Sequence, residues 1–149
     1  MGRKILFATL TAGLLALGGG TALAAVVEGT PGADDLAGGN APDTLLGGPG
    51  KDSLDGRGGD DPLRGEEGDD TFTDLAGDDI LRGGLGDDTL GGNPGDDAIA
   101  VPGFGAGPPG LPLEPDAISC GPGRDRVVAQ KVDRVAGDCE EVDRLGSGN

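Results

Sequence analysis

The chain has 149 residues, with 27 acidic against 11 basic side chains and a formal net charge of −16. It contains no His, Trp or Tyr and only three Phe, which excludes an ordinary aromatic-rich core, while its charge disfavours nucleic acid and anionic lipid as partners. This composition alone is typical of an acidic disordered chain, but the same charge attracts divalent cations.

Residues 1–24 have the pattern of a cleaved secretory signal. Arg3 and Lys4 precede an apolar stretch of 13 residues, Ile5 to Leu17, and an A-x-A motif at 22–24 follows as a signal peptidase site. The apolar stretch is too short to span a bilayer, although an uncleaved membrane anchor is the alternative. We therefore expect a secreted, extracellular protein whose mature chain does not insert into a membrane.

Residues 29–100 repeat every nine positions, eight times in succession, with the pattern G-G-x-G-x-D-x-U-x, where U is a large apolar residue. The sixth place always holds an aspartate: Asp34, Asp43, Asp52, Asp61, Asp70, Asp79, Asp88 and Asp97. The eighth place is always large and apolar: Leu36, Leu45, Leu54, Leu63, Phe72, Leu81, Leu90 and Ile99. A disordered chain has no need of such regularity, whereas stacked repeats gain a shared core from it.

Each row is predicted to divide into a six-residue Gly-rich loop and a three-residue strand with one side chain inward. Such rows resemble the repeats-in-toxin (RTX, haemolysin-type) family of secreted bacterial proteins, whose nonapeptide binds calcium. The resemblance implies an all-β fold, a right-handed parallel β-roll (β-solenoid) of about four turns with two rows in each turn. Alternate eighth-place residues would then form two internal columns, one headed by Leu36 and the other by Leu45.

The resemblance also implies calcium as the bound ion, with the eight sixth-place aspartates as its ligands. Stacked strands lie about 4.8 Å apart, so carboxylates of alternate rows come close enough to share a cation. Calcium accepts 6 to 8 oxygens in flexible geometry, and Gly-rich turns offer carbonyls, whereas magnesium demands a tighter octahedron. Three gaps between four loops on each side give about six sites at most.

Departures from the pattern predict unequal sites. Ala41 and Pro42 distort the loop of row two, Asp74 and Leu75 replace both leading glycines of row six, and Arg57 lowers affinity nearby. The best sites are expected in rows five, seven and eight. Acids at the fifth place are expected to be solvated rather than ligating: Asp60, Asp69, Asp78, Asp87 and Asp96.

Beyond the calcium-binding repeats, assigned to residues 25–100, a Pro/Gly-rich linker is predicted at 101–115. The phase then returns, so residues 116–149 are predicted to form a degenerate C-terminal cap of the roll. Cys120 and Cys139 lie 19 positions apart, close to the 18 residues of one turn, which favours a disulfide in a secreted protein. Two free thiols or a metal site are the alternatives.

Catalysis is not expected. The chain has no His, hence no Ser-His-Asp set, and Cys120 has no activating partner. We predict a secreted calcium-binding β-roll protein that folds on binding extracellular calcium. The alternative is a structural or adhesive module of the cell surface or extracellular space; the sequence identifies no protein or surface partner.

Overall fold

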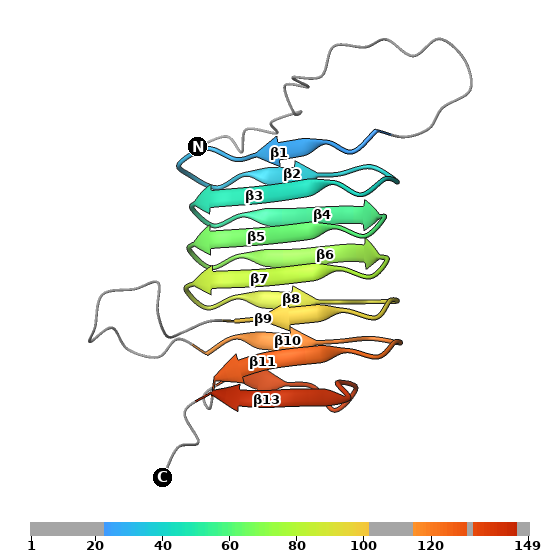
Figure 1. The fold of residues 1–149 in the computed structure, drawn as a ribbon. Helices are drawn as coiled ribbons and strands as arrows, with labels where there is room; N and C mark the ends of the chain where they lie inside the picture. The colour runs from blue at the N-terminus through green and yellow to red at the C-terminus, as the bar shows by residue number, and fades with distance from the viewer. Residues whose placement is uncertain (1–22, 102–114, 131–132, 146–149) are drawn as a thin grey trace.

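The structure is a computed structural model that describes residues 23–101, 115–130 and 133–145. Every regular element in these ranges is a β-strand, and the strands stack into a parallel β-solenoid of about six turns (Figure 1). Within the described ranges there is no helix with the length and apolarity needed to cross a membrane. Most of the predicted signal (1–22) and of the predicted linker (102–114) lie outside the described residues.

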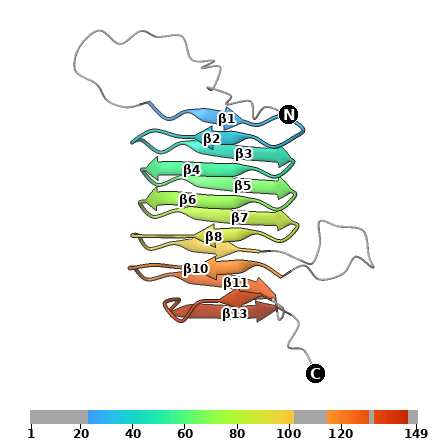
Figure 2. The same ribbon diagram turned by 180° about the vertical axis from the view of Figure 1, so that it is seen from behind.

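Successive strands alternate between two sheets, and the view from behind shows the same stacking on the opposite side (Figure 2). The seven-stranded sheet consists, in spatial order, of β1 (Val26–Glu28), β3 (Thr44–Pro49), β5 (Pro62–Glu67), β7 (Ile80–Leu85), β9 (Ala98–Ala100), β11 (Arg126–Gln130) and β13 (Glu141–Leu145). The six-stranded sheet consists of β2 (Asp35–Ala37), β4 (Ser53–Gly58), β6 (Thr71–Ala76), β8 (Thr89–Gly91), β10 (Ala117–Ser119) and β12 (Arg134–Val135).

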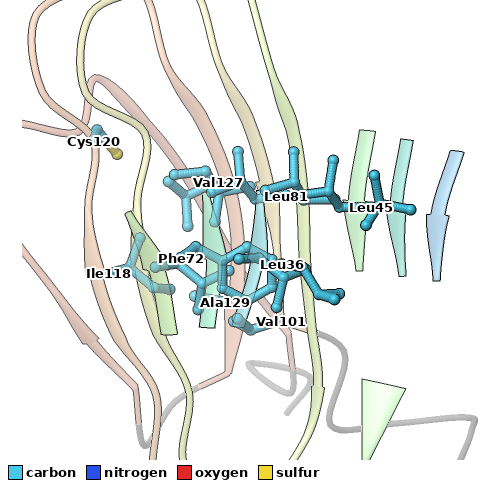
Figure 3. Packing of buried hydrophobic residues seen from close by; sticks show 14 residues of the cluster. Leu36, Leu45, Phe72, Leu81, Val101, Ile118, Cys120, Val127 and Ala129 are labelled. Atoms are coloured by element: carbon cyan, nitrogen blue, oxygen red, sulfur yellow. The ribbon is translucent and has the colours of Figure 1, made fainter. Parts of the chain in front are cut away.

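The core is two side chains thick because each repeat strand turns its large eighth-place residue fully inward. Parallel pairing sets Leu45 opposite Leu63 and Leu54 opposite Phe72, so equivalent residues of alternate rows stack. The two predicted columns are confirmed, and Figure 3 shows them facing each other. The column that contains Leu45 also includes Val27, Val127 and Val142, and the column that contains Leu36 also includes Ile118 and Val135.

The predicted division into six-residue loops and three-residue strands is wrong for β3 to β7. Each of these strands has six residues, because places one to three of the following row continue the parallel ladder, as in Gly48 opposite Glu66. The chain bends at the second place, where φ is positive: 69° at Arg57, 82° at Glu66 and 63° at Asn93. Only places four to six remain as the turn.

The predicted count of four turns is also too low. Strand β1 adds a strand before the first repeat, and β10 to β13 extend both sheets beyond the last one. Strand β10 pairs with β8 and β11 with β9, so the predicted cap continues the stack in register. The predicted disulfide between Cys120 and Cys139 is confirmed, with a Cα–Cα distance of 5.2 Å.

Candidate metal centre

The sixth-place aspartates lie at the turns between the sheets, and all eight are buried, with at most 4% of each residue exposed. The structure brings alternate rows together and separates consecutive ones, which gives two ladders of carboxylates. One ladder contains Asp34, Asp52, Asp70 and Asp88, and the other Asp43, Asp61, Asp79 and Asp97. Each pair predicted to share a cation is thus adjacent in space.

One oxygen of each interior carboxylate is fixed by the backbone. The N–H of Asp52 donates to Asp70 Oδ1 at 2.8 Å, and the same bond recurs along both ladders at 2.7–2.9 Å. The other oxygen, Oδ2, is buried without a hydrogen-bond partner in six of them: Asp52, Asp61, Asp70, Asp79, Asp88 and Asp97. A buried carboxylate oxygen without a partner is costly, and a cation satisfies it.

The first-place glycines leave room for these oxygens. A Cβ built on Gly47 would lie 2.7 Å from both Asp52 Oδ2 and the carbonyl oxygen of Gly65, one turn later. At the fourth place, a Cβ on Gly50 would meet the Gly32 carbonyl oxygen and lie 3.1 Å from Asp52 Oδ1. A Cβ built on Gly29 would likewise meet the Gly47 carbonyl oxygen and lie 3.0 Å from Asp34 Oδ2. Two carboxylate oxygens, of Asp34 and Asp52, and two carbonyl oxygens, of Gly32 and Gly47, therefore lie between rows one and three.

This donor set consists of hard oxygens only, which suits calcium. Among the described residues, no three His, Cys, Asp or Glu side chains gather into a metal-holding group. The ladders instead combine a few carboxylates with backbone carbonyls, so the residues present fit a calcium ion held between two stacked rows.

Burial raises the pKa of six ladder carboxyls, from Asp52 to Asp97. Desolvation, opposed by the backbone hydrogen bond and reinforced by the neighbouring carboxylates, raises the pKa to about 6 for Asp70 and Asp79 and to about 7 for Asp88 and Asp97. The pKa of Asp52 is raised for the same reasons. Ionised ladders at neutral pH therefore require compensating positive charge.

Sequence reasoning missed that the cap continues both ladders. The N–H of Asp88 donates to Asp116 Oδ1 at 2.8 Å, and that of Asp97 to Asp125 Oδ1 at 2.9 Å. The N–H of Asp116 donates in turn to Asp133 Oδ1 at 3.3 Å, and that of Asp125 to Glu140 Oε2 at 3.0 Å. The acid-x-apolar phase at 116–118, 125–127 and 133–135 could have identified three of these four acids.

The fifth-place acids are exposed, as expected, but they form ladders of their own. The N–H of Asp78 donates to Asp60 Oδ1 at 3.1 Å, and that of Asp96 to Asp78 Oδ1 at 2.9 Å. On the other edge the N–H of Asp87 donates to Asp69 Oδ1 at 3.2 Å. We call these residues the outer ladders, and the sixth-place residues the inner ladders.

The rows with doubtful loops still join the inner ladder. In row two, which contains Ala41 and Pro42, the Asp43 N–H donates to Asp61 Oδ1 at 2.7 Å. In row six Asp79 Oδ1 accepts from the Asp61 N–H at 2.8 Å, and the backbone of Leu75 pairs in register with Arg57. The lower affinity expected for these rows therefore remains a prediction about the loops.

Comparison with known families adds an independent finding. The model of the RTX calcium-binding nonapeptide repeat (4 copies) matches residues 28–61 and 64–99. These two ranges contain all eight sixth-place aspartates and end before the cap. Comparisons with curated proteins and with solved structures find no significant match.

Proposed function

We propose that this chain, whose residues 28–61 and 64–99 belong to the RTX calcium-binding nonapeptide repeats, is a secreted protein whose roll forms when extracellular calcium binds. The observation that carries the proposal is the row of buried Oδ2 atoms without hydrogen-bond partners, which at Asp52, Asp70 and Asp97 lie at the same glycine as a backbone carbonyl oxygen of the next stacked row. The ligands proposed are the eight sixth-place aspartates together with these carbonyls.

Electrostatic repulsion gives the reason for coupling between binding and folding. Two carboxylates about 5 Å apart repel by roughly 3 kcal/mol at an effective dielectric constant of 20, and each inner ladder stacks several of them. The two-residue-thick core and the 33 glycines offer little to offset this repulsion and the lost chain entropy. The stacked state therefore depends on the cations that its carboxylates hold.

Binding to the folded state alone also stabilises it by mass action. Each site contributes about 2.7 kcal/mol when free calcium exceeds its Kd a hundredfold. Several sites along one stack make the folding transition steep in calcium concentration, because each turn is stabilised only by neighbours that have also formed. Extracellular calcium thus acts as the signal that the chain has left the cell.

A calcium titration of the full chain, followed by far-ultraviolet circular dichroism, tests the coupling. We expect a disordered spectrum in chelator, a β spectrum with calcium, and no such change with magnesium at equal concentration. A β-rich spectrum already present in chelator would contradict calcium-dependent folding. Calorimetry that counts no bound ions would contradict the ligand assignment.

Secretion has a separate test. The proposed cleavage after Ala24 predicts Ala25 as the first residue of protein recovered from the culture medium. Replacing Ala22 and Ala24 together by bulky residues should abolish this processing, and N-terminal sequencing measures it. Protein that remains in the cell with Met1 at its start would exclude this route.

A further inference from the structure

The first row of the cap, Cys120 to Val128, stacks on row eight in the same way as one repeat row stacks on another. Val127 lies opposite Ile99 in the parallel ladder, and the Asp97 N–H donates to Asp125 Oδ1 at 2.9 Å. Neither Cys120 nor Asp125 lies in the residues that match the RTX repeat. The loop 120–125 is therefore a candidate site that the family match does not assign.

The oxygens between these two rows reproduce those between ordinary rows. A Cβ built on Gly92 would meet Asp97 Oδ2 and lie 2.7 Å from the Cys120 carbonyl oxygen, which takes the position that a glycine carbonyl has elsewhere. A Cβ built on Gly123 would meet the Gly95 carbonyl oxygen and lie 3.2 Å from Asp125 Oδ1. Two carboxylate oxygens and two carbonyl oxygens thus lie between row eight and the cap, as they do between rows one and three.

Unsatisfied charge points to a ligand in this space. Asp97 and Asp125 are 2% and 1% exposed, and Oδ2 of each is buried without a hydrogen-bond partner. The Oδ2 of Asp97 is the atom beside the Cys120 carbonyl, so it is directed into the space between the rows. A divalent cation with a preference for oxygen satisfies all four groups.

The residues around Cys120 hold its carbonyl in place. The Asp138 carboxylate accepts hydrogen bonds from Ser119 Oγ at 3.1 Å and from the Gly121 N–H at 3.2 Å. The adjacent Cys139 forms the disulfide with Cys120, whose side chain is fully buried. This clamp fixes the peptide on both sides of the carbonyl that faces Asp97.

We propose that row eight and the cap bind a further calcium ion, through Asp97, Asp125 and the carbonyls of Gly95 and Cys120, and that the Cys120–Cys139 disulfide positions this site. The proposal rests on calcium binding by the repeats and adds one ion to those that they hold. It gives the disulfide a second role, because a group that orients a metal ligand affects affinity as well as stability.

Calorimetric counting of calcium on the full chain tests the site. Asp125→Asn keeps the shape of the side chain and an oxygen for the Asp97 N–H but removes the charge, so we expect one ion fewer per chain than in the wild type. The matched control is Asp143→Asn, an exposed cap carboxylate that pairs with Arg126 at 3.1 Å, and it should leave the count unchanged. An unchanged count in Asp125→Asn would overturn the proposal.

The disulfide is tested by the double variant Cys120→Ser, Cys139→Ser. It keeps every ligand atom, so the ion count should be unchanged while the affinity of one site falls about tenfold. All sites retaining wild-type affinity would contradict the positioning role. A wild-type chain that binds no calcium would instead refute the proposed function of the repeats, so the two failures are distinguishable.

Crystallography decides the matter if Asp125→Asn does not reach the wild-type dichroism at saturating calcium. In crystals of the calcium-loaded wild type we expect an ion about 2.3–2.6 Å from both Asp97 Oδ2 and the Cys120 carbonyl oxygen. Ions between the repeat rows with none between row eight and the cap would overturn the proposal.

Discussion

An inner and an outer ladder of aspartates run along the same edge of the solenoid, one residue apart in the sequence. Asp61, Asp79 and Asp97 are at most 2% exposed, whereas Asp60, Asp78 and Asp96 lie in solvent. Both ladders use a backbone N–H to Oδ1 bond across one turn, but in opposite directions: the inner carboxylate belongs to the later row and the outer one to the earlier row. Burial, rather than residue type, therefore separates the acids that we propose to hold ions from those that we expect only to attract them.

The largest effect is expected when the two neighbouring aspartates of row six are substituted in separate variants. Asp79→Asn removes a charge that borders two gaps, so the calcium concentration at the midpoint of folding should rise at least about tenfold. Asp78→Asn, its exposed neighbour, should raise the midpoint less than about twofold. Calcium titrations followed by circular dichroism measure both midpoints. Equal shifts would mean that the inner and outer ladders contribute equally to calcium binding.

Protonation of the inner-ladder carboxylates should substitute for calcium, because it also removes their mutual repulsion. Burial raises the pKa of Asp88 and Asp97 to about 7 in the folded chain, so their contribution to stability is fully present below their unfolded pKa near 4 and is lost as pH rises through about 7. In chelator, the chain should therefore gain β structure on acidification from pH 8 to about 4.5. A calcium-free spectrum that stays disordered down to pH 4 would show that inner-ladder repulsion is not what keeps the chain open.

Neutralising one outer ladder should have a moderate effect that depends on salt. The triple variant Asp60→Asn, Asp78→Asn, Asp96→Asn should lower the apparent calcium affinity about threefold at low ionic strength, because exposed acids concentrate cations. The difference from the wild type should vanish near 1 M salt, where the screening length is about 3 Å. A deficit that persists in high salt would instead make these acids ligands.

The smallest effect is expected from an exposed ion pair on the other outer ladder. Lys51 Nζ lies 3.7 Å from Asp69 Oδ2, with side chains 72% and 55% exposed. Lys51→Met should change the free energy of unfolding in calcium by less than about 0.5 kcal/mol, as measured by urea denaturation. A loss above about 1.5 kcal/mol would show that this edge is not fully screened by solvent.

The parts of the structure that repeat were predictable because they are fixed by place in the row. Leu54 and Phe72 stack, and Asp52 and Asp70 join in a ladder, for the same reason: 18 residues make one turn. The strand length was not predictable, because continuation through the second place requires a positive φ that nothing in the glutamate at position 66 indicates.

The ends of the stack escaped prediction for a different reason. Val27 pairs with Leu45, but Ala25 stands two positions before Val27, where the repeats have an aspartate, so the motif does not mark β1. Glu140 continues a ladder of aspartates only seven residues after Asp133, where the nine-residue phase is lost. The site beside Cys120 depends on a carbonyl 28 residues from Gly92, and only the folded chain shows that proximity.

The junction between row eight and the cap has a practical consequence. Ladder bonds span 18 residues within the repeats but 28 from Asp88 to Asp116 and from Asp97 to Asp125, yet β10 and β11 keep the parallel register. The stack thus accommodates ten residues more than a regular turn. Because the entropy of closing a loop grows by only about 0.6 kcal/mol for each doubling of length, longer sequences should be tolerated between Val101 and Pro115. An unrelated domain inserted in this stretch would then be displayed on a scaffold whose assembly we propose to depend on calcium.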